Sequence, residues 1–217
     1  MKIYQRIKDI PSMFIRHKFS RIYRNNLFLG TESRSGEGSG LSQTFTIRKE
    51  IPKLIIDLNV RSLIDAPCGD FLWMQEIDLP VEKYIGIDIV QEIIKDNQQK
   101  YGNGQRSFQN LNIIEDELPT ADMILCRDCL VHLSYSHCKK IITNFRVSGS
   151  KYLLTTTFIK RPNNVNLGKG FWRPLNLEKT PFNFPKPILI INENCTEDNG
   201  KYSDKSLGLW MLKDITI

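Results

Sequence analysis

The stretch Arg61-Ser-Leu-Ile-Asp-Ala-Pro-Cys-Gly-Asp70, followed by Tyr84-Ile-Gly-Ile-Asp88, decides the fold of this chain. One apolar run ends at Asp65, a tight turn passes through Gly69, and a second apolar run ends at Asp88. Gly69 and Asp88 are 19 residues apart. A doubly wound sheet places a glycine turn after its first strand and an acid after its second strand at this spacing. The stretch therefore predicts an α/β fold with a nucleotide-like ligand over the turn.

The acids of this turn restrict the kind of ligand. A dinucleotide site has three glycines, because a pyrophosphate must lie against the helix N-terminus. Here the turn has one glycine, and Asp65 and Asp70 flank it. Two carboxylates repel a pyrophosphate, but they suit a ligand with an ammonium, a sulfonium and a bare ribose. Asp88 is expected to accept hydrogen bonds from the ribose hydroxyls.

At these residues the sequence resembles the class I S-adenosylmethionine-dependent methyltransferases. Asp65-Ala-Pro-Cys-Gly-Asp70 resembles their motif I, usually D-x-G-C-G-x-G, although Pro67 and Phe71 stand where that motif has glycine. Residues 84–88 resemble the motif that carries the ribose-binding acid. Residues 121–133 resemble the fourth strand and the loop after it.

The resemblance covers roughly residues 35–217 and implies one Rossmann-like methyltransferase domain over residues 31–217. It implies a mostly parallel sheet of seven strands with helices on both faces. It also implies S-adenosylmethionine as the cofactor, and no metal is expected. The candidate cofactor-binding residues in these segments are Asp65, Pro67, Cys68, Gly69, Asp70, Asp88, Ile89, Asn112 and Arg127.

Hydrophobic patterning along the chain favours the same organisation. Apolar runs predict strands at 62–66, 84–88, 106–111, 122–126, 151–157, 187–192 and 207–213, and helical spacing predicts helices at 43–58, 90–101 and 135–147. Alternation of strands and helices favours parallel pairing, with ligands at the carboxyl ends of the strands. The longest apolar runs fall short of the ~18–20 residues that cross a membrane.

The net charge of +6 lies entirely in the first thirty residues. Residues 1–30 hold seven Lys and Arg against one Asp, and the remainder holds 23 bases and 23 acids. Ile3, Ile7, Ile10 and Phe14 recur at helical spacing. Residues 1–30 are therefore predicted to form a basic amphipathic helical arm.

Three partners fit such an arm. It can pack its apolar stripe on the domain, lie on an anionic membrane surface, or contact nucleic-acid phosphate. Packing on the domain is favoured, and peripheral membrane contact stays open. Removal of residues 1–20 is then expected to leave cofactor binding nearly intact.

A Gly- and Ser-rich segment, Gly30–Gly40, precedes a helical pattern that opens at Leu41. A flexible linker is one interpretation. The other, which is favoured and which the resemblance to similar methyltransferases implies, is a lid that becomes ordered over the cofactor when S-adenosylmethionine binds. Free N–H groups at a helix N-terminus bind carboxylates, so the methionine carboxylate of the cofactor is expected near Ser39 and Thr44.

A catalytic base is expected after the fourth strand, where methyltransferases carry catalytic or substrate groups. Asp128 and His132 are four residues apart, so on a helical turn both side chains face one side. A neutral imidazole accepts a proton near neutral pH. His132 is therefore the candidate general base, and Asp128 is the residue that orients it or contacts the substrate. The alternative is a structural role for His132 within an apolar helix.

The segment between the fifth and sixth strands predicts a substrate-facing rim. Lys160–Lys186 is rich in proline, which excludes a helix, and long loops of this kind are usually functional. The candidate substrate residues are Trp172, Arg173 and Asn176 in this segment and Lys205 further along.

These features predict O-methylation of a sugar, a glycan or another small hydroxylated acceptor. Enzymes that methylate the exocyclic amines of DNA bases carry [DNS]-P-P-[YFW] after the fourth strand, whereas this chain has Cys126-Arg-Asp-Cys129. Nucleic acid is therefore not expected as a partner. An RNA-binding or RNA-modifying methyltransferase that uses the basic arm is the alternative function.

The five cysteines indicate a reducing, cytoplasmic location. Cys126 and Cys129 have C-x-x-C spacing, which is typical of redox motifs and of half a zinc site. Since the sequence has no second pair of this kind, packed reduced thiols are favoured. The sequence leaves the oligomeric state open.

Overall fold

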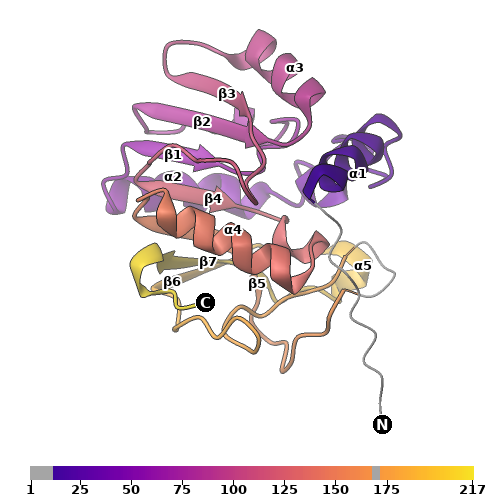
Figure 1. Cartoon of the computed structure of the whole chain (residues 1–217), viewed down its shortest axis with the longest axis vertical. Helices are drawn as coiled ribbons and strands as arrows, with labels where there is room; N and C mark the ends of the chain where they lie inside the picture. The colour runs from indigo at the N-terminus through magenta and orange to yellow at the C-terminus, as the bar shows by residue number, and fades with distance from the viewer. Residues whose placement is uncertain (1–11, 168–171) are drawn as a thin grey trace.

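The computed structural model describes residues 12–167 and 172–217 (Figure 1). Its α-helices are α1 (Ser12–Arg24), α2 (Phe45–Asp57), α3 (Gln91–Tyr101), α4 (Tyr135–Val147) and the short α5 (Glu197–Gly200). Its strands are β1 (Ser62–Asp65), β2 (Lys83–Asp88), β3 (Arg106–Asn110), β4 (Met123–Cys126), β5 (Tyr152–Phe158), β6 (Leu189–Asn192) and β7 (Lys205–Met211). The predicted strands and the three predicted helices are thus confirmed, with shifts at their ends. Helix α1 lies within the predicted arm.

The strands form one seven-stranded sheet in the order β3-β2-β1-β4-β5-β7-β6. Strands β1 to β5 pair in parallel, and β7 inserts antiparallel between β5 and β6. The mostly parallel sheet is therefore confirmed. The strand order reverses between β1 and β4, and ligands of such sheets bind in the crevice beyond the carboxyl ends of the strands at this point.

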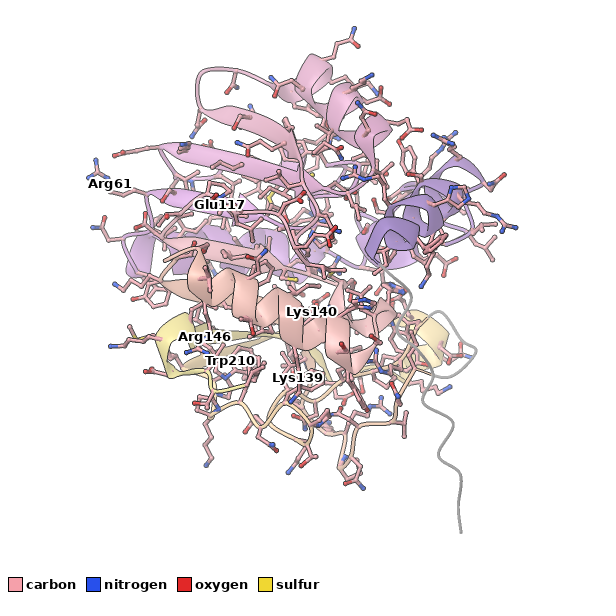
Figure 2. All side chains as sticks on the ribbon, viewed as in Figure 1. Arg61, Glu117, Lys139, Lys140, Arg146 and Trp210 are labelled. Atoms are coloured by element: carbon pink, nitrogen blue, oxygen red, sulfur yellow. The ribbon has the colours of Figure 1, made fainter. Side chains whose placement is uncertain are left out.

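Helices cover both faces of the sheet, as predicted (Figure 1). Helix α2 buries Ile47 and Ile51 against one face, because its apolar residues recur every three or four positions. Helix α4 buries Ile141 and Phe145 against the other face, while its Lys140 remains exposed (Figure 2). The two helices therefore fix the sheet from opposite sides and leave the carboxyl ends of the strands accessible to a ligand.

The segment between β5 and β6 packs into the core. Leu175, Leu177 and Phe182 are buried in the apolar cluster that also holds the inner face of α4. The indole of Trp210 on β7, labelled in Figure 2, donates a hydrogen bond of 2.8 Å to the carbonyl oxygen of Pro185. Over its described residues the segment has no helix or strand, as predicted. The apolar side chains of its described residues turn inward, which argues against the predicted substrate-facing rim.

Helix α1 packs an apolar stripe on the domain. Ile15 and Ile22 are buried, and Ile15 joins the core cluster on the α4 face of the sheet. The residues of α1 therefore pack on the domain, in line with the favoured interpretation, while the arm over residues 1–30 stays a prediction. The stripe itself differs from the prediction, because Phe14 is 54% exposed. The other predicted members of the stripe, Ile3, Ile7 and Ile10, lie outside the described residues.

Candidate active site

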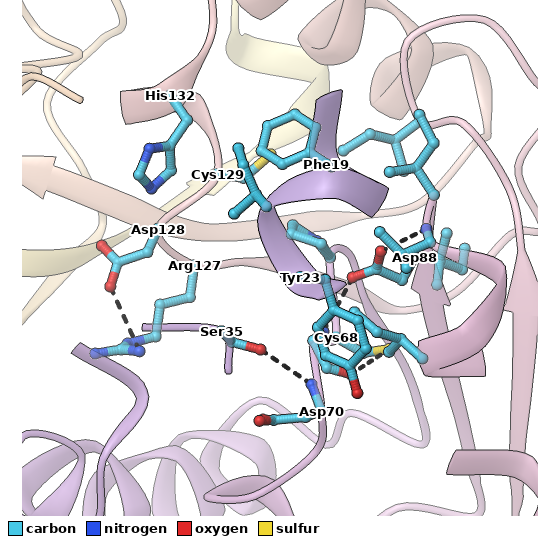
Figure 3. A pocket seen from close by; sticks show the side chains of 18 of the residues that line it. Phe19, Tyr23, Ser35, Cys68, Asp70, Asp88, Arg127, Asp128, Cys129 and His132 are labelled. Atoms are coloured by element: carbon cyan, nitrogen blue, oxygen red, sulfur yellow. Dashed lines mark hydrogen bonds and ion pairs between the residues drawn. The ribbon is translucent and has the colours of Figure 1, made fainter. Parts of the chain in front are cut away.

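A pocket lies at the carboxyl ends of β1, β2 and β4 (Figure 3). The end of β1 and the turn after it contribute Asp65 and Gly69, and the end of β2 contributes Asp88. The segment after β4 contributes Arg127 and Asp128. The residues predicted from separate stretches of sequence therefore meet in one place. This follows from parallel pairing, which brings the carboxyl ends of the strands to the same edge.

The turn after β1 brings the backbone up to the acid of β2. Gly69 has a φ angle of 55°, a conformation that glycine adopts readily and other residues do not. Its N–H donates a hydrogen bond of 3.2 Å to Oδ2 of Asp88. A Cβ atom on Gly69 would lie 2.4 Å from Oγ of Ser35, so a larger residue would collide with the segment above the turn.

Four further predicted cofactor residues, Pro67, Cys68, Ile89 and Asn112, also line the pocket. The peptide bond before Pro67 is cis. Burial raises the pKa of the Cys68 thiol well above its ordinary value, so the thiol stays protonated. These residues therefore supply apolar and neutral polar surface between the charged groups.

Two buried carboxyl groups with raised pKa values, Asp65 and Asp88, lie at this end of the pocket. Burial raises the pKa of Asp65 to about 7, although the hydroxyl of Tyr84 donates a hydrogen bond of 2.7 Å to it. Burial also raises the pKa of Asp88 to about 6, although the N–H groups of Val90 and Gly69 donate to it. A cation bound beside these acids would favour their ionised forms.

The segment Gly30–Gly40 lies over the turn after β1. Ser33 Oγ donates to Oδ2 of Asp70 at 2.8 Å, and the N–H of Arg34 donates to the same oxygen at 2.9 Å. In return the N–H of Asp70 donates to Oγ of Ser35 at 3.1 Å, as Figure 3 shows. These contacts favour a segment that folds over the site rather than a flexible linker, while its ordering on cofactor binding stays a prediction.

The two residues predicted to meet a cofactor carboxylate differ in position. Ser39 lines the pocket. Thr44 is fully buried, and its Oγ1 donates a hydrogen bond of 2.9 Å to the carbonyl oxygen of Gly40. The Thr44 side chain therefore faces the interior of the fold rather than the pocket.

Helix α1 forms a wall of the pocket that sequence reasoning missed. Ile15, Phe19 and Ile22 line the pocket, and Tyr23 lies beside Asp70 in Figure 3. The spacing of the three apolar residues was the available signal, but it does not say what the stripe covers. This wall argues against the expectation that removal of residues 1–20 leaves cofactor binding nearly intact, which stays a prediction.

Basic side chains attach α1 to the domain. Nη1 of Arg16 donates to the carbonyl oxygen of Ile89 at 2.7 Å and to Oδ1 of Asn110 at 2.6 Å. Arg24 forms an ion pair with Glu92 of α3. Two of the basic side chains of the arm therefore bind groups of the domain itself.

Asp128 and His132 lie at the other end of the pocket, which we call the acceptor end. Asp128 has a φ angle of 51°, and His132 ends a short 3-10 helix, Leu130–His132. The predicted pairing at i and i+4 of an α-helical turn is therefore wrong. Both side chains nevertheless line the pocket, and Figure 3 shows the His132 ring next to the Asp128 carboxylate. The His132 ring packs against Phe28, with ring centroids 4.8 Å apart.

Asp128 belongs to a group of charges, which we call the charged cluster, whose members Arg127, Glu193 and Lys205 are buried. Nζ of Lys205 is 2.6 Å from Oδ2 of Asp128, 3.7 Å from Oε2 of Glu193 and 3.6 Å from Oε2 of Glu197. Arg127 approaches Oε2 of Glu193 to 2.7 Å and Oδ2 of Asp128 to 3.5 Å. The cluster joins the ends of β4 and β6, the start of β7 and α5.

Arg127 and Lys205 are held within the fold by these contacts. Burial works against the charged form of Lys205, but the attraction of Asp128 and Glu193 outweighs it and raises the pKa of Lys205. Nη2 of Arg127 also donates to the carbonyl oxygen of Gly38 at 2.7 Å. Arg127 lines the pocket as predicted, whereas Lys205, a predicted substrate residue, lies behind Asp128 and does not line it.

The other predicted substrate residues also turn away from the pocket. The guanidinium of Arg173 donates to three backbone carbonyl oxygens within residues 130–133. Asn176 is buried and donates to backbone carbonyl oxygens as well. Trp172 packs edge-on against Phe158, with ring centroids 5.7 Å apart. These contacts hold the segment before β6 onto the domain, so they give the three residues a structural role.

Two further findings concern the whole described part of the chain. Among residues 12–167 and 172–217, no helix is long and apolar enough to cross a membrane. Within the same residues, no group of three or more His, Cys, Asp and Glu is placed to hold a metal ion. All five cysteines are free thiols.

Comparisons with known proteins identify the fold. No protein-family model matches the chain, and no curated protein matches its sequence. The 1,6-didemethyltoxoflavin-N1-methyltransferase of Burkholderia thailandensis, solved with 1,6-didemethyltoxoflavin and S-adenosylhomocysteine, is similar in structure with a TM-score of 0.65. The two chains are 12% identical, and the match covers 92% of this chain and 88% of that chain.

Two other solved structures share the architecture. The methyltransferase domain of bacterial CtHen1 gives a TM-score of 0.56 at 12% identity, over 79% of this chain and all of that chain. The magnesium protoporphyrin IX methyltransferase of Synechocystis PCC 6803, with bound S-adenosylhomocysteine, gives a TM-score of 0.52 at 16% identity. This match covers 69% of this chain and 73% of that chain. The chain therefore has the class I S-adenosylmethionine-dependent methyltransferase fold, as the resemblance implied.

Proposed function

We propose that this chain is an S-adenosylmethionine-dependent methyltransferase. The observation that carries the proposal is a single pocket with buried acids at one end, Asp65 and Asp88, and with His132 and Asp128 at the other. When bound, S-adenosylmethionine supplies a methyl group on a positively charged sulfur, which is activated for transfer. Two of the similar structures hold S-adenosylhomocysteine, which supports the same kind of ligand here.

The residues of the pocket fit this cofactor. Asp88 is buried and has oxygens that can accept from a ribose diol, and Asp65 offers a second carboxylate to a cationic ligand. Ile15, Phe19 and Ile89 offer apolar surface to a nucleobase. Anionic and apolar surfaces thus lie side by side, as a cationic nucleoside requires.

The acceptor in this proposal is a hydroxyl of a small neutral molecule, such as a sugar or a glycan. His132 is the general base that takes the hydroxyl proton during transfer. Asp128 accepts a hydrogen bond from the acceptor and orients it. Phe28 and Trp73, which also line the pocket, offer ring faces to the acceptor. The remaining work of this site is to align the acceptor oxygen with the methyl group.

An amine is the second candidate acceptor, and Asp128 favours it. Burial alone would raise the pKa of Asp128, but Lys205 and Arg127 outweigh this effect and lower the pKa to about 2. A carboxylate that stays ionised binds an N–H donor well and removes protons poorly. The similar structure from Burkholderia thailandensis is named as an N1-methyltransferase.

The contacts of α1 bear on the alternative partners. Arg16 and Arg24 contact the domain, which weakens the alternative of an arm that binds RNA phosphate. Arg21 and Phe14 remain exposed, so peripheral membrane contact stays a prediction. A reducing, cytoplasmic location also stays a prediction, which the free thiols favour.

Incubation with S-adenosylmethionine and an acceptor panel tests the proposal. The panel contains neutral sugars, polysaccharide fragments, small amines and RNA, and mass spectrometry detects the gain of one methyl group. We expect product with a neutral hydroxylated acceptor. Product with amines alone would favour the second candidate, and product with RNA alone would contradict both.

A further inference from the structure

We infer that Lys205 is a positioning residue, which holds the Asp128 carboxylate as the anchor for an uncharged or cationic N–H or O–H group of the acceptor. The inference rests on the proposed function and adds a substrate class to it. The two residues are 77 positions apart in sequence, and β7 brings Lys205 to the end of β4.

The two oxygens of Asp128 have different surroundings. Oδ2 lies 2.6 Å from Nζ of Lys205, whose side chain is only 5% exposed. Oδ1 is buried and has no hydrogen-bond partner among the described residues. A buried acceptor without a partner costs free energy, which a donor from a ligand removes. The Asp128 side chain is 22% exposed and lines the pocket, so an acceptor that binds there can supply the missing donor to Oδ1.

The backbone of Asp128 is also held in an unusual conformation. Its φ angle of 51° is uncommon for residues other than glycine and carries a cost in free energy. The N–H of Asp128 donates a hydrogen bond of 2.9 Å to Oγ1 of Thr156 on β5. The backbone is thus fixed from β5 and the carboxylate from β7, which places Oδ1 in one position.

The charges around Asp128 select the acceptor. Lys205 faces it from β7, Arg127 from the end of β4, and His132 from the 3-10 helix. Glu193 and Glu197 contact Lys205 from the far side. Three carboxylates thus meet two permanent cations, so the charged cluster has a net negative charge. An acceptor with a carboxylate or phosphate beside its reacting group is repelled, and a neutral or cationic donor is bound.

Carbon-13 NMR of aspartate side-chain carboxyl groups tests the Lys205–Asp128 contact without any acceptor. The full chain is titrated from pH 8 to pH 4, and Asp128→Asn assigns the signal. We expect no inflection for Asp128 in the wild type and an inflection within this range in Lys205→Met. Lys205→Arg should restore the wild-type behaviour. An Asp128 signal that titrates alike in all three proteins would overturn the inference.

A second variant covers the case in which Lys205→Met does not fold. Loss of the ammonium leaves three carboxylates around Arg127, so Lys205→Met combined with Glu193→Gln removes one of them. The double variant lacks the contact with Asp128 but carries the same net charge in the cluster as the wild type. In the double variant, too, we expect the Asp128 carboxyl signal to show an inflection between pH 8 and pH 4. A double variant without this inflection would count against the inference.

Kinetics with an acceptor from the panel test the consequence for the substrate. In Lys205→Met the acceptor KM should rise about tenfold or more, and activity should fall at low pH as Asp128 becomes protonated. Affinity for S-adenosylmethionine should stay within threefold. An unchanged KM and pH profile would overturn the role of Lys205. Failure of the wild type to methylate anything would instead contradict the proposed function, while the NMR titration still decides the Lys205 contact.

Discussion

The two ends of the pocket are built in different ways. The cofactor end comes from two short stretches, 61–70 and 84–88, on neighbouring parallel strands. The acceptor end comes from the segment after β4, a 3-10 helix and the segment before α2. The start of β7 and the end of β6 support it from behind. A site made from local turns can be read from sequence spacing. A site that depends on pairs 66 and 77 residues apart can be read only from the fold.

The largest effect is expected at the acceptor end. His132→Ala should lower the rate at saturating cofactor by about 10²–10⁴-fold, the usual contribution of a positioned general base. Affinity for the cofactor should change no more than a few-fold, so this one variant distinguishes the role of the acceptor end from that of the cofactor end. Initial rates and calorimetry measure the two quantities. His17→Ala, at an exposed position of α1, is the matched control. A rate of His132→Ala within threefold of wild type on an alcohol acceptor would show that His132 is not the general base.

At the cofactor end, Asp88→Ala should weaken S-adenosylmethionine binding by about 1.5–3 kcal/mol, because charge-assisted hydrogen bonds to the ribose are lost. Calorimetry measures the change. Asp78→Ala, at an exposed loop position, should bind like the wild type. Equal affinities of the Asp88→Ala and wild-type proteins would mean that the ribose lies elsewhere.

Helix α1 offers a matched pair that tests its role as a wall. Phe19 lines the pocket, whereas Phe14 on the same helix is 54% exposed. Phe19→Ala should weaken cofactor binding by about 1–2 kcal/mol through lost apolar contact, and Phe14→Ala should leave it unchanged. If neither change affected S-adenosylmethionine binding, α1 would not be a wall of the cofactor site.

The buried acids predict a smaller effect on stability. Asp65 and Asp88 have pKa values of about 7 and about 6 in the fold, against about 3.9 for an unfolded aspartate. The folded state therefore binds more protons between pH 4 and pH 7, and its stability falls as pH rises through this window. The melting temperature without cofactor should drop by several degrees from pH 5 to pH 8. The low pKa of Asp128 acts below this window.

Asp65→Asn should flatten the pH dependence, because the amide does not ionise. The exposed Asp78→Asn should keep it. Thermal unfolding of the three proteins at four pH values provides the comparison. A melting temperature that rises with pH in the wild type would show that these acids are ionised without cost.

Sequence reasoning reached the strands, the order of motifs and the acids of the cofactor end, because each depends on residues close in the chain. It placed α1 outside the site, since the spacing of Ile15 and Phe19 describes a stripe and not the surface that the stripe covers. It read Arg173 as a substrate residue, since polar residues in a proline-rich loop look exposed. The fold instead turns the neighbouring Leu175 inward and satisfies Arg173 with backbone carbonyls.

Titration calorimetry of the wild-type chain with S-adenosylmethionine tests the central claim most directly. The claim is that the pocket between the turn after β1, Asp88 and α1 binds this cofactor. We expect binding with one site per chain, without added metal, that tightens as pH rises from 6 to 7.5 because the ligand favours ionised Asp65 and Asp88. Absence of binding under these conditions, or binding that is unchanged in Asp88→Ala, would contradict the account.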